Sequence, residues 1–183
     1  MVHERGYWLS MNDMKSHRYD KALNDAIIHL FPVKTIVDIG CGRGEYIKCF
    51  LDNNINCIGY DGSPLTSELT KGLCQIKDFS EPVDIGKFEL VLSLEVGEHI
   101  PVQYEQVFID NLCRASIRYI CVSWGIVGQN GLGHVNCRNN DYIIEEFKKR
   151  GFYYLEIESK QLREFSELSW FKNTIMVFKQ NEN

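Results

Sequence analysis

Short apolar runs alternate along this chain with amphipathic stretches in which hydrophobic residues recur at helical spacing. The apolar runs are rich in β-branched residues and several end at glycine or an acidic residue, as buried strands do. We predict strands at residues 35–40, 56–62, 73–80, 88–96, 119–125, 153–159 and 173–180. We predict helices at residues 21–31, 44–54, 102–115 and 139–152. This alternation predicts an α/β fold, with a mostly parallel, doubly wound sheet and helices on both faces.

The composition is that of one globular domain: 183 residues, 44% hydrophobic and 25% charged. A formal net charge of −5 disfavours sequence-independent electrostatic binding of nucleic acid. No apolar run approaches the roughly 20 residues that cross a bilayer, and the start lacks an apolar signal core. We therefore expect a cytoplasmic protein without membrane association. The seven scattered cysteines indicate reduced thiols.

A glycine-rich segment follows the first predicted strand. Residues 37–46 read VDIGCGRGEY, which places Gly40, Gly42 and Gly44 where the next helix begins. Such glycines let the backbone turn and approach a ligand, and the free N–H groups of the helix face the same space. The spacing matches neither the dinucleotide fingerprint nor the P-loop. Glu45 would also repel a pyrophosphate, so the segment disfavours nicotinamide and flavin dinucleotides.

Acidic residues end the next two predicted strands. Asp61 follows the last glycine of the loop by 17 residues, where it can accept both hydroxyls of a ribose, and Gly62 lets the chain pass close by. Asp78 and Phe79 offer an acceptor for an exocyclic amine and an apolar surface for adenine. Asp38 lies beside the loop, where its carboxylate would attract a cationic group of a ligand. Together these residues predict a site for an adenosine that carries few phosphates.

The motifs VDIGCGRG, GYDGS, KDFS and FELVLSLEVGEHIP occur in this order, and the chain resembles the class I S-adenosylmethionine-dependent methyltransferases. The resemblance covers roughly residues 20 to 155. It implies a seven-stranded sheet whose last strand is antiparallel. It also implies that S-adenosylmethionine is the cofactor, with its methionine part near Asp38 and the glycine loop. The residues implied to contact the cofactor are Asp38, Gly40, Cys41, Gly42, Gly44, Asp61, Gly62, Asp78, Phe79, Leu94 and Glu95.

A second group of titratable residues lies at and beyond the end of the fourth predicted strand. Glu95, Glu98 and His99 fall within five residues, and His134 follows in a glycine-rich loop that should lie beside them. Three interpretations remain open for this group. It removes the proton of a hydroxyl acceptor aligned with the sulfonium methyl, with Glu98, His99 and His134 as the catalytic candidates. It binds a divalent metal through all four side chains, as in small-RNA 3′-terminal 2′-O-methyltransferases, although we do not favour a metal. It is scaffold only.

Two further segments are candidates for the rim of the site. The loop 124–141 is long enough to be a functional lid, and its candidates for acceptor recognition are Trp124, Gln129, His134 and Asn136. In many relatives the segment before the first helix folds over the cofactor. Residues 1–20 are therefore a possible lid, with Tyr7, Trp8, Arg18 and Tyr19 as candidates. Residues 169–174 should form a turn, to which we assign no chemistry.

The short, acidic chain lacks the interleaved basic and aromatic residues of a strand-binding groove, so we disfavour nucleic acid as a partner. We expect O-methylation of a small hydroxylated acceptor, such as a sugar or another metabolite. Alternatives are an RNA 2′-O- or protein methyltransferase with the metal site above, and a non-catalytic S-adenosylmethionine-binding partner subunit. A nicotinamide-dependent oxidoreductase is the least favoured alternative. The acceptor and the oligomeric state are not readable from the sequence.

Overall fold

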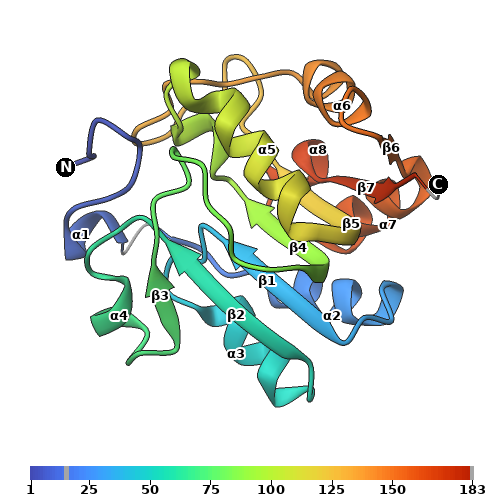
Figure 1. Cartoon of the computed structure of the whole chain (residues 1–183), viewed down its shortest axis with the longest axis horizontal. Coiled ribbons are helices and arrows are strands. Elements are labelled where there is room, and N and C mark those ends of the chain that lie inside the picture. The colour runs from blue at the N-terminus through green and yellow to red at the C-terminus, as the bar shows by residue number, and fades with distance from the viewer. Residues whose placement is uncertain (15–16, 182–183) are drawn as a thin grey trace.

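The structure is a computed structural model that describes residues 1–14 and 17–181. Within these residues, one sheet has the strand order β3-β2-β1-β4-β5-β7-β6, which Figure 1 shows from edge to edge. Its strands are β1 (Thr35–Ile39), β2 (Asn56–Asp61), β3 (Cys74–Ile76), β4 (Phe88–Leu94), β5 (Ser116–Ser123), β6 (Phe152–Tyr154) and β7 (Met176–Gln180). The neighbouring pairs from β3 to β5 are parallel, whereas β7 runs antiparallel to both β5 and β6. This confirms the predicted sheet with its antiparallel last strand.

Helices of varied length connect the strands. They are α1 (Met11–Met14), α2 (Lys21–Leu30), α3 (Glu45–Asp52), α4 (Thr66–Leu69), α5 (Glu105–Ala115), α6 (Asn140–Lys148), α7 (Glu156–Phe165) and α8 (Phe171–Thr174), with 3-10 turns η1 (Gly97–His99) and η2 (Val102–Tyr104). Asp20 caps α2 by accepting a hydrogen bond from the backbone N–H of Leu23. Among the described residues, none of these helices is both long and apolar enough to cross a membrane.

Alternate residues of the central strands supply two hydrophobic clusters, one on each face of the sheet. On one face, Val37 of β1 and Val91 of β4 belong to the same cluster as Phe108 of α5 and Phe147 of α6. Figure 1 shows α5 crossing in front of the sheet on this face. On the other face, a second cluster joins β1, β4 and β7 to α2, α3 and α7. The central strands are therefore covered on both sides, which explains why they read as continuous apolar runs.

The prediction of a strand over 153–159 is wrong for most of that range. The strand β6 ends at Tyr154, and α7 begins at Glu156. The alternating pattern of this segment imitates a strand, but the buried positions of the helix, Ser159 and Leu162, lie three residues apart. The Ser159 hydroxyl also accepts a hydrogen bond from the backbone N–H of Val177 in β7. Tertiary contact with β7 therefore favours the helix over a longer strand.

The other predicted elements are present with shifted ends. The expected strand over 73–80 is paired only at 74–76, because Asp78 turns the chain by accepting a hydrogen bond from the backbone N–H of Ser80. The expected helix 102–115 starts as the 3-10 turn η2 and becomes α-helical at Glu105. The expected turn over 169–174 contains α8. Shifts of this size are normal at element ends.

Candidate functional site

A cavity of about 420 Å³ opens at the carboxyl ends of the parallel strands, where ligands bind in open α/β sheets. Ten of the fourteen residues that the sequence predicts as cofactor-binding or catalytic line this cavity. They are Gly40, Gly42, Asp61, Gly62, Asp78, Phe79, Leu94, Glu95, His99 and His134. The cavity thus brings together residues from β1, β2 and β4 and from the segments that follow β3 and β5.

The other four predicted residues lie behind the lining. Asp38 is 3% exposed, and burial, followed by the charges of Cys74 and Asp61, raises the pKa of its carboxyl well above the usual range. Asp38 therefore does not present a ready anion to the cavity. Cys41 is buried against Cys74 and Ile47. Gly44 is the residue before α3 and adopts a left-handed conformation, with φ of 72°. The fourth residue is Glu98, which is described below.

The glycine loop and Asp61 are joined by hydrogen bonds. The Asp61 carboxylate accepts from the backbone N–H of Gly42 at 3.0 Å and from that of Ser63 at 2.8 Å. Burial raises the pKa of Asp61, and these two hydrogen bonds partly oppose the rise. Gly40 has a φ of 85°, and a Cβ there would lie 2.2 Å from a methyl group of Val96. Only glycine fits this turn beside the cavity.

The segment after β3 adds a carboxylate and an aromatic ring. Phe79 is 5% exposed and packs against Tyr60, with their ring centroids 5.9 Å apart. The Asp78 carboxylate accepts from the Ser80 N–H and forms an ion pair with Arg5 at 2.9 Å. Burial raises the pKa of Asp78, but these two hydrogen-bonded partners outweigh burial and hold it below its usual value.

The N-terminal segment lies along the mouth of the cavity. Figure 1 shows it beside the arrowheads of the parallel strands. A Cβ at Gly62 would lie 2.6 Å from the Tyr7 ring, and the Trp8 ring packs edge-on against His99 at 5.8 Å between centroids. Of the predicted lid candidates, Tyr7, Trp8 and Arg18 line the cavity. Tyr19 does not, and its ring packs against Tyr46 instead.

Glu95 lies where β4 ends and has a left-handed backbone, with φ of 53°. This conformation is uncommon for a residue with a side chain and often marks a functional position. One carboxylate oxygen accepts from the Gln129 side-chain amide at 2.7 Å, and the other accepts from the Thr174 hydroxyl at 3.4 Å. Glu95 therefore connects the end of β4 to the loop after β5 and to α8.

Glu98, His99 and His134 form a compact group, which we call the histidine cluster. One potential ligand atom of each lies within 4.8 Å of the others. Among the described residues, neither carboxyl oxygen of Glu98 nor Nδ1 of His99 has a hydrogen-bond partner. Glu98 is fully buried, and burial, followed by the charge of Glu95, raises its pKa well above the usual value. Buried polar atoms without partners are rare and indicate a missing ligand or proton.

The two histidines of the cluster face each other edge-on, with ring centroids 4.9 Å apart. Burial, followed by the neighbouring His134, lowers the pKa of His99 to about 4, so its imidazole is neutral at physiological pH. Nδ1 of His134 lies 3.2 Å from the backbone oxygen of Gln129. A carbonyl only accepts, so this contact places a proton on Nδ1, and in the neutral imidazole the lone pair is then on Nε2. This Nε2 atom lies 3.9 Å from the Glu98 carboxyl.

The predicted loop 124–141 brings two of its four predicted recognition residues to the cavity, Gln129 and His134. The other two lie outside the lining and hold the loop. Trp124 and Asn136 are 1% and 4% exposed, and the Trp124 indole N–H donates to the backbone oxygen of Asn136 at 2.7 Å. Their polarity and position in a glycine-rich loop suggested recognition, but burial makes them part of the framework.

Sequence reasoning missed several cavity residues. They are Arg5, Met14, His17, Tyr46, Trp170 and Phe171, among others. Trp170 and Phe171 come from the segment to which we assigned no chemistry, although two adjacent large aromatics in a turn are a usable signal. His17 forms an ion pair with Glu45 at 3.2 Å, which no pattern in the sequence indicated.

With the fold and the cavity established, comparison with known proteins assigns the family. The sequence profile of the family described as "Methyltransferase domain" matches residues 12–116, more than half of the chain. This chain belongs to the class I S-adenosylmethionine-dependent methyltransferases. The family predicted from the four motifs is therefore confirmed, and so is its fold.

Individual relatives of this methyltransferase act on different small molecules. A chloroplastic tocopherol O-methyltransferase from Arabidopsis thaliana is 32% identical over 108 residues, which are 50% of this chain; the chain covers 30% of that relative's length. An S-adenosylmethionine-bound amino pentose methyltransferase from Micromonospora echinaspora has a TM-score of 0.71 at 10% identity, covering 98% of this chain and 100% of that one. Magnesium protoporphyrin IX methyltransferase from Synechocystis, with bound S-adenosylhomocysteine (SAH), has a TM-score of 0.67 at 15% identity, covering 87% and 81%. At these identities the two structures are similar in fold alone.

Proposed function

We propose that this chain transfers the methyl group of S-adenosylmethionine to a hydroxyl of a small acceptor. The observation that carries the proposal is one cavity lined both by the predicted cofactor residues and by two histidines. Its volume of about 420 Å³ lies in the range of small-molecule sites. Methyl transfer needs an aligned acceptor beside the sulfonium methyl and a group that takes the acceptor proton.

In the proposed complex, the cofactor lies across the ends of β1, β2 and β3. The backbone around Gly40 and Gly42 would contact the methionine part, and Asp61 would accept the ribose hydroxyls. Phe79 would cover one face of the adenine, and Asp78 would accept its amine. Supporting this orientation, the Asp61 carboxylate is held beside the glycine loop by hydrogen bonds from the backbone N–H groups of Gly42, within the loop, and Ser63, just after β2.

The proposed acceptor binds beside the histidine cluster. His99 and His134 are the candidates for general base, because each lines the cavity as an imidazole. The neutral state of His99 and the lone pair on Nε2 of His134 both suit proton removal. Glu98 is a poorer base, because its raised pKa keeps the carboxyl protonated. Trp170 and Phe171 offer apolar walls for the body of the acceptor.

The N-terminal segment is proposed as the cover of the cofactor. Its contacts reach from Arg5 at Asp78 to Trp8 at His99, and thus span the proposed adenine and acceptor positions. Trp8 would then separate the reacting methyl group from water. This arrangement supports the predicted lid at residues 1–20, of which residues 15 and 16 lie outside the described part of the chain.

A small molecule remains the proposed acceptor, rather than RNA or protein. The tocopherol O-methyltransferase and the amino pentose methyltransferase are named for small substrates. The net charge of −5 also disfavours a polyanionic partner. The expectation of a cytoplasmic location stays a prediction, because the Arabidopsis relative is chloroplastic.

A second candidate function is metal-assisted methyl transfer. It is favoured by the histidine cluster, where the Glu98 carboxyl has no hydrogen-bond partner among the described residues and one potential ligand atom each of Glu98, His99 and His134 lies within 4.8 Å of the others. These three side chains would hold a divalent ion, which when bound lowers the pKa of a coordinated hydroxyl. The fourth predicted ligand, Glu95, is not part of this cluster, and its oxygens already accept from Gln129 and Thr174.

One experiment tests both candidates. SAH binding is measured by calorimetry, and a panel of hydroxylated metabolites is then screened for SAH release with Mg²⁺, with Mn²⁺ and with EDTA. We expect SAH binding and turnover of at least one acceptor in EDTA. Turnover only with an added ion would favour the metal site. SAH binding without turnover on any acceptor would favour the non-catalytic partner subunit, and failure to bind SAH would reject the proposal.

A further inference from the structure

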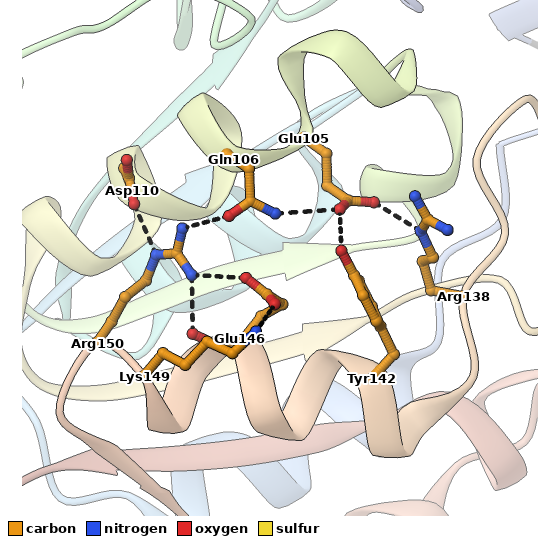
Figure 2. A network of polar contacts seen from close by, with 8 residues as sticks. All are labelled: Glu105, Gln106, Asp110, Arg138, Tyr142, Glu146, Lys149 and Arg150. Carbon is orange, nitrogen blue, oxygen red and sulfur yellow. Dashed lines mark hydrogen bonds and ion pairs between the residues drawn. The ribbon is translucent and has the colours of Figure 1, made fainter.

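A buried carboxylate outside the cavity organises the loop that carries His134. Glu105, the first residue of α5, is 2% exposed and is not part of the cavity lining. Its oxygens accept hydrogen bonds from the Asn136 amide at 2.9 Å, from Nε of Arg138 at 2.7 Å and from the Tyr142 hydroxyl. Figure 2 shows Arg138 and Tyr142 converging on Glu105. The Arg138 guanidinium also stacks over the Tyr142 ring, 4.8 Å from its centroid.

The charge of Glu105 is maintained by these partners. Burial raises its pKa, but the hydrogen bonds from Tyr142, Arg138 and Asn136 outweigh burial and lower the pKa below the usual value. Glu105 is therefore a carboxylate at neutral pH. A buried charge that satisfies four side-chain donors, from Asn136, Arg138, Tyr142 and Gln106, fixes their positions, because each donor would otherwise lose a charge-assisted hydrogen bond.

The residues held by Glu105 are also tied to the acceptor side of the site. The backbone N–H of Asn136 donates to the backbone oxygen of Glu98 at 2.9 Å, and the backbone oxygen of Asn136 accepts from the Trp124 indole N–H. The backbone N–H of Arg138 donates to the Gly125 oxygen at 2.9 Å. Glu105 therefore fastens the end of the loop 125–139 to its beginning and to η1, which carries Glu98.

His134 lies two residues before Asn136, on the part of the loop that depends on this anchor. Among the described residues, its side chain has one polar contact as short as 3.2 Å, between Nδ1 and the backbone oxygen of Gln129, and longer contacts with the Cys137 thiol at 3.6 Å and the Glu98 carboxyl at 3.9 Å. The loop conformation thus decides where Nε2 points. If residues 136–138 were displaced, the loop would no longer fix the tautomer or the orientation of the His134 imidazole.

We propose that Glu105 is a positioning residue that holds His134 toward the acceptor through Asn136 and Arg138. The inference rests on the proposed role of His134 in methyl transfer. Glu105 touches neither proposed substrate, so it is not a catalytic residue. The proposal predicts that replacing the Glu105 carboxylate changes the conformation of the loop 125–139 and leaves the cofactor side of the cavity unaffected.

Glu146 offers a matched control within the same network. It is also a buried carboxylate, 4% exposed, and it accepts from Lys149 and from Arg150 at 2.9 Å. Figure 2 places these partners at the other end of α6, away from Arg138 and Tyr142. Glu146→Gln therefore removes a buried charge between α5 and α6 without touching the loop. A merely structural role for Glu105 would give both variants the same result.

The test uses ¹⁵N-labelled full-length protein without ligand, so it does not depend on knowing the acceptor. Imidazole ¹H–¹⁵N spectra report which ring nitrogen of each histidine carries the proton, and His134→Gln assigns the His134 signals. We expect the Nδ1–H form to dominate for His134 in the wild type and in Glu146→Gln. In Glu105→Gln the population of this form should fall at least about twofold, because the loop no longer presents the Gln129 oxygen.

Hydrogen exchange and SAH binding complete the test. The amides of Val135, Asn136 and Arg138 should exchange about tenfold faster or more in Glu105→Gln, but not in Glu146→Gln, since local opening of the loop becomes easier. SAH affinity should match the wild type in both variants. If the wild-type protein does not bind SAH, the proposed function is rejected. The measured effect of Glu105 on the conformation of His134 would still be valid.

A third variant keeps the proposal falsifiable if Glu105→Gln does not fold. The Arg138 side chain is 30% exposed, so Arg138→Gln removes one anchor of the loop at a tolerant position. It should shift the His134 tautomer in the same direction by a smaller amount. If every variant that folds retains the wild-type His134 signals, Glu105 is not a positioning residue and the inference is overturned.

Discussion

The two sides of the cavity are built by different means. On the proposed cofactor side, most of the contacts at the ends of β1 to β3 link residues within or between successive strand ends: Asp61 meets Gly42, 19 positions earlier, and Ser63, and Asp78 meets Ser80. On the acceptor side, the histidine cluster joins η1 to a residue more than 30 positions later in the chain. Within the part of the chain that the structure describes, Glu98 and His99 keep side-chain polar atoms without hydrogen-bond partners.

This difference separates binding from reactivity. Backbone turns and satisfied carboxylates make the cofactor side a preformed surface, which suits recognition of one constant ligand. The proposed acceptor side holds the neutral His99 imidazole and the Glu98 carboxyl, whose pKa burial raises, in low-dielectric surroundings where proton transfer is sensitive to small displacements. Substitutions on the two sides should therefore alter different measurements, namely affinity for SAH and turnover.

The strongest test of this separation replaces His99 by alanine. We expect His99→Ala to reduce turnover on the best acceptor of the metabolite panel by roughly 10²-fold or more, since a general base contributes about 10²–10⁴-fold. Affinity for SAH, measured by calorimetry, should stay near the wild-type value. Turnover that survives this change would make His99 part of the scaffold.

The buried state of His99 should also be visible in the dependence of stability on pH. The pKa of His99 is lowered from 6.5 to about 4, so the unfolded chain binds a proton between these values and the native state does not. The free energy of unfolding should therefore fall by up to about 3 kcal/mol as the pH decreases from about 6.5 to about 4. Below about pH 4 this histidine should cause no further loss. Urea unfolding at several pH values measures this slope, and His99→Gln should lack it. Equal slopes in both proteins would contradict the buried neutral imidazole.

On the cofactor side, Asp61→Ala should weaken SAH binding by about 1–3 kcal/mol through the loss of charged hydrogen bonds. Calorimetry provides the measurement, and Asp84→Ala is a suitable control, because Asp84 lies outside the cavity lining. Unchanged SAH affinity in Asp61→Ala would refute the ribose role and with it the proposed orientation of the cofactor.

The smallest effect is expected at the mouth of the cavity. Arg5 forms ion pairs with Asp78 and Glu81, and both Arg5 and Glu81 are solvent-accessible. Arg5→Ala should lower the Tm slightly at low ionic strength, and the difference should vanish in about 1 M salt, where exposed charges are screened. A difference that persists in high salt would mean that Arg5 holds the N-terminal segment by packing rather than by charge.

The cofactor side was the more predictable part of the site. Its residues follow directly after strands, so the strand pattern and the positions of Gly40, Asp61 and Asp78 were sufficient to bring them together. On the acceptor side, the sequence indicated His99 and His134 but misjudged Trp124 and Asn136, which hold the loop from inside. It also missed Trp170 and Phe171, because the aromatic pair marks the turn as unusual but does not specify that the turn packs against the cavity.

The sequence by itself determined the sheet, the glycine loop and the family, because these depend on hydrophobic periodicity and on backbone demands that act over a few residues. Tertiary structure decided the rest. It turned an apparent strand after β6 into α7, buried Asp38 and Glu98 out of reach of the cavity, and placed Glu105 beneath the loop that carries His134. These outcomes depend on which side chains meet across long separations in the chain, and burial then fixes their charge states, as no local pattern could.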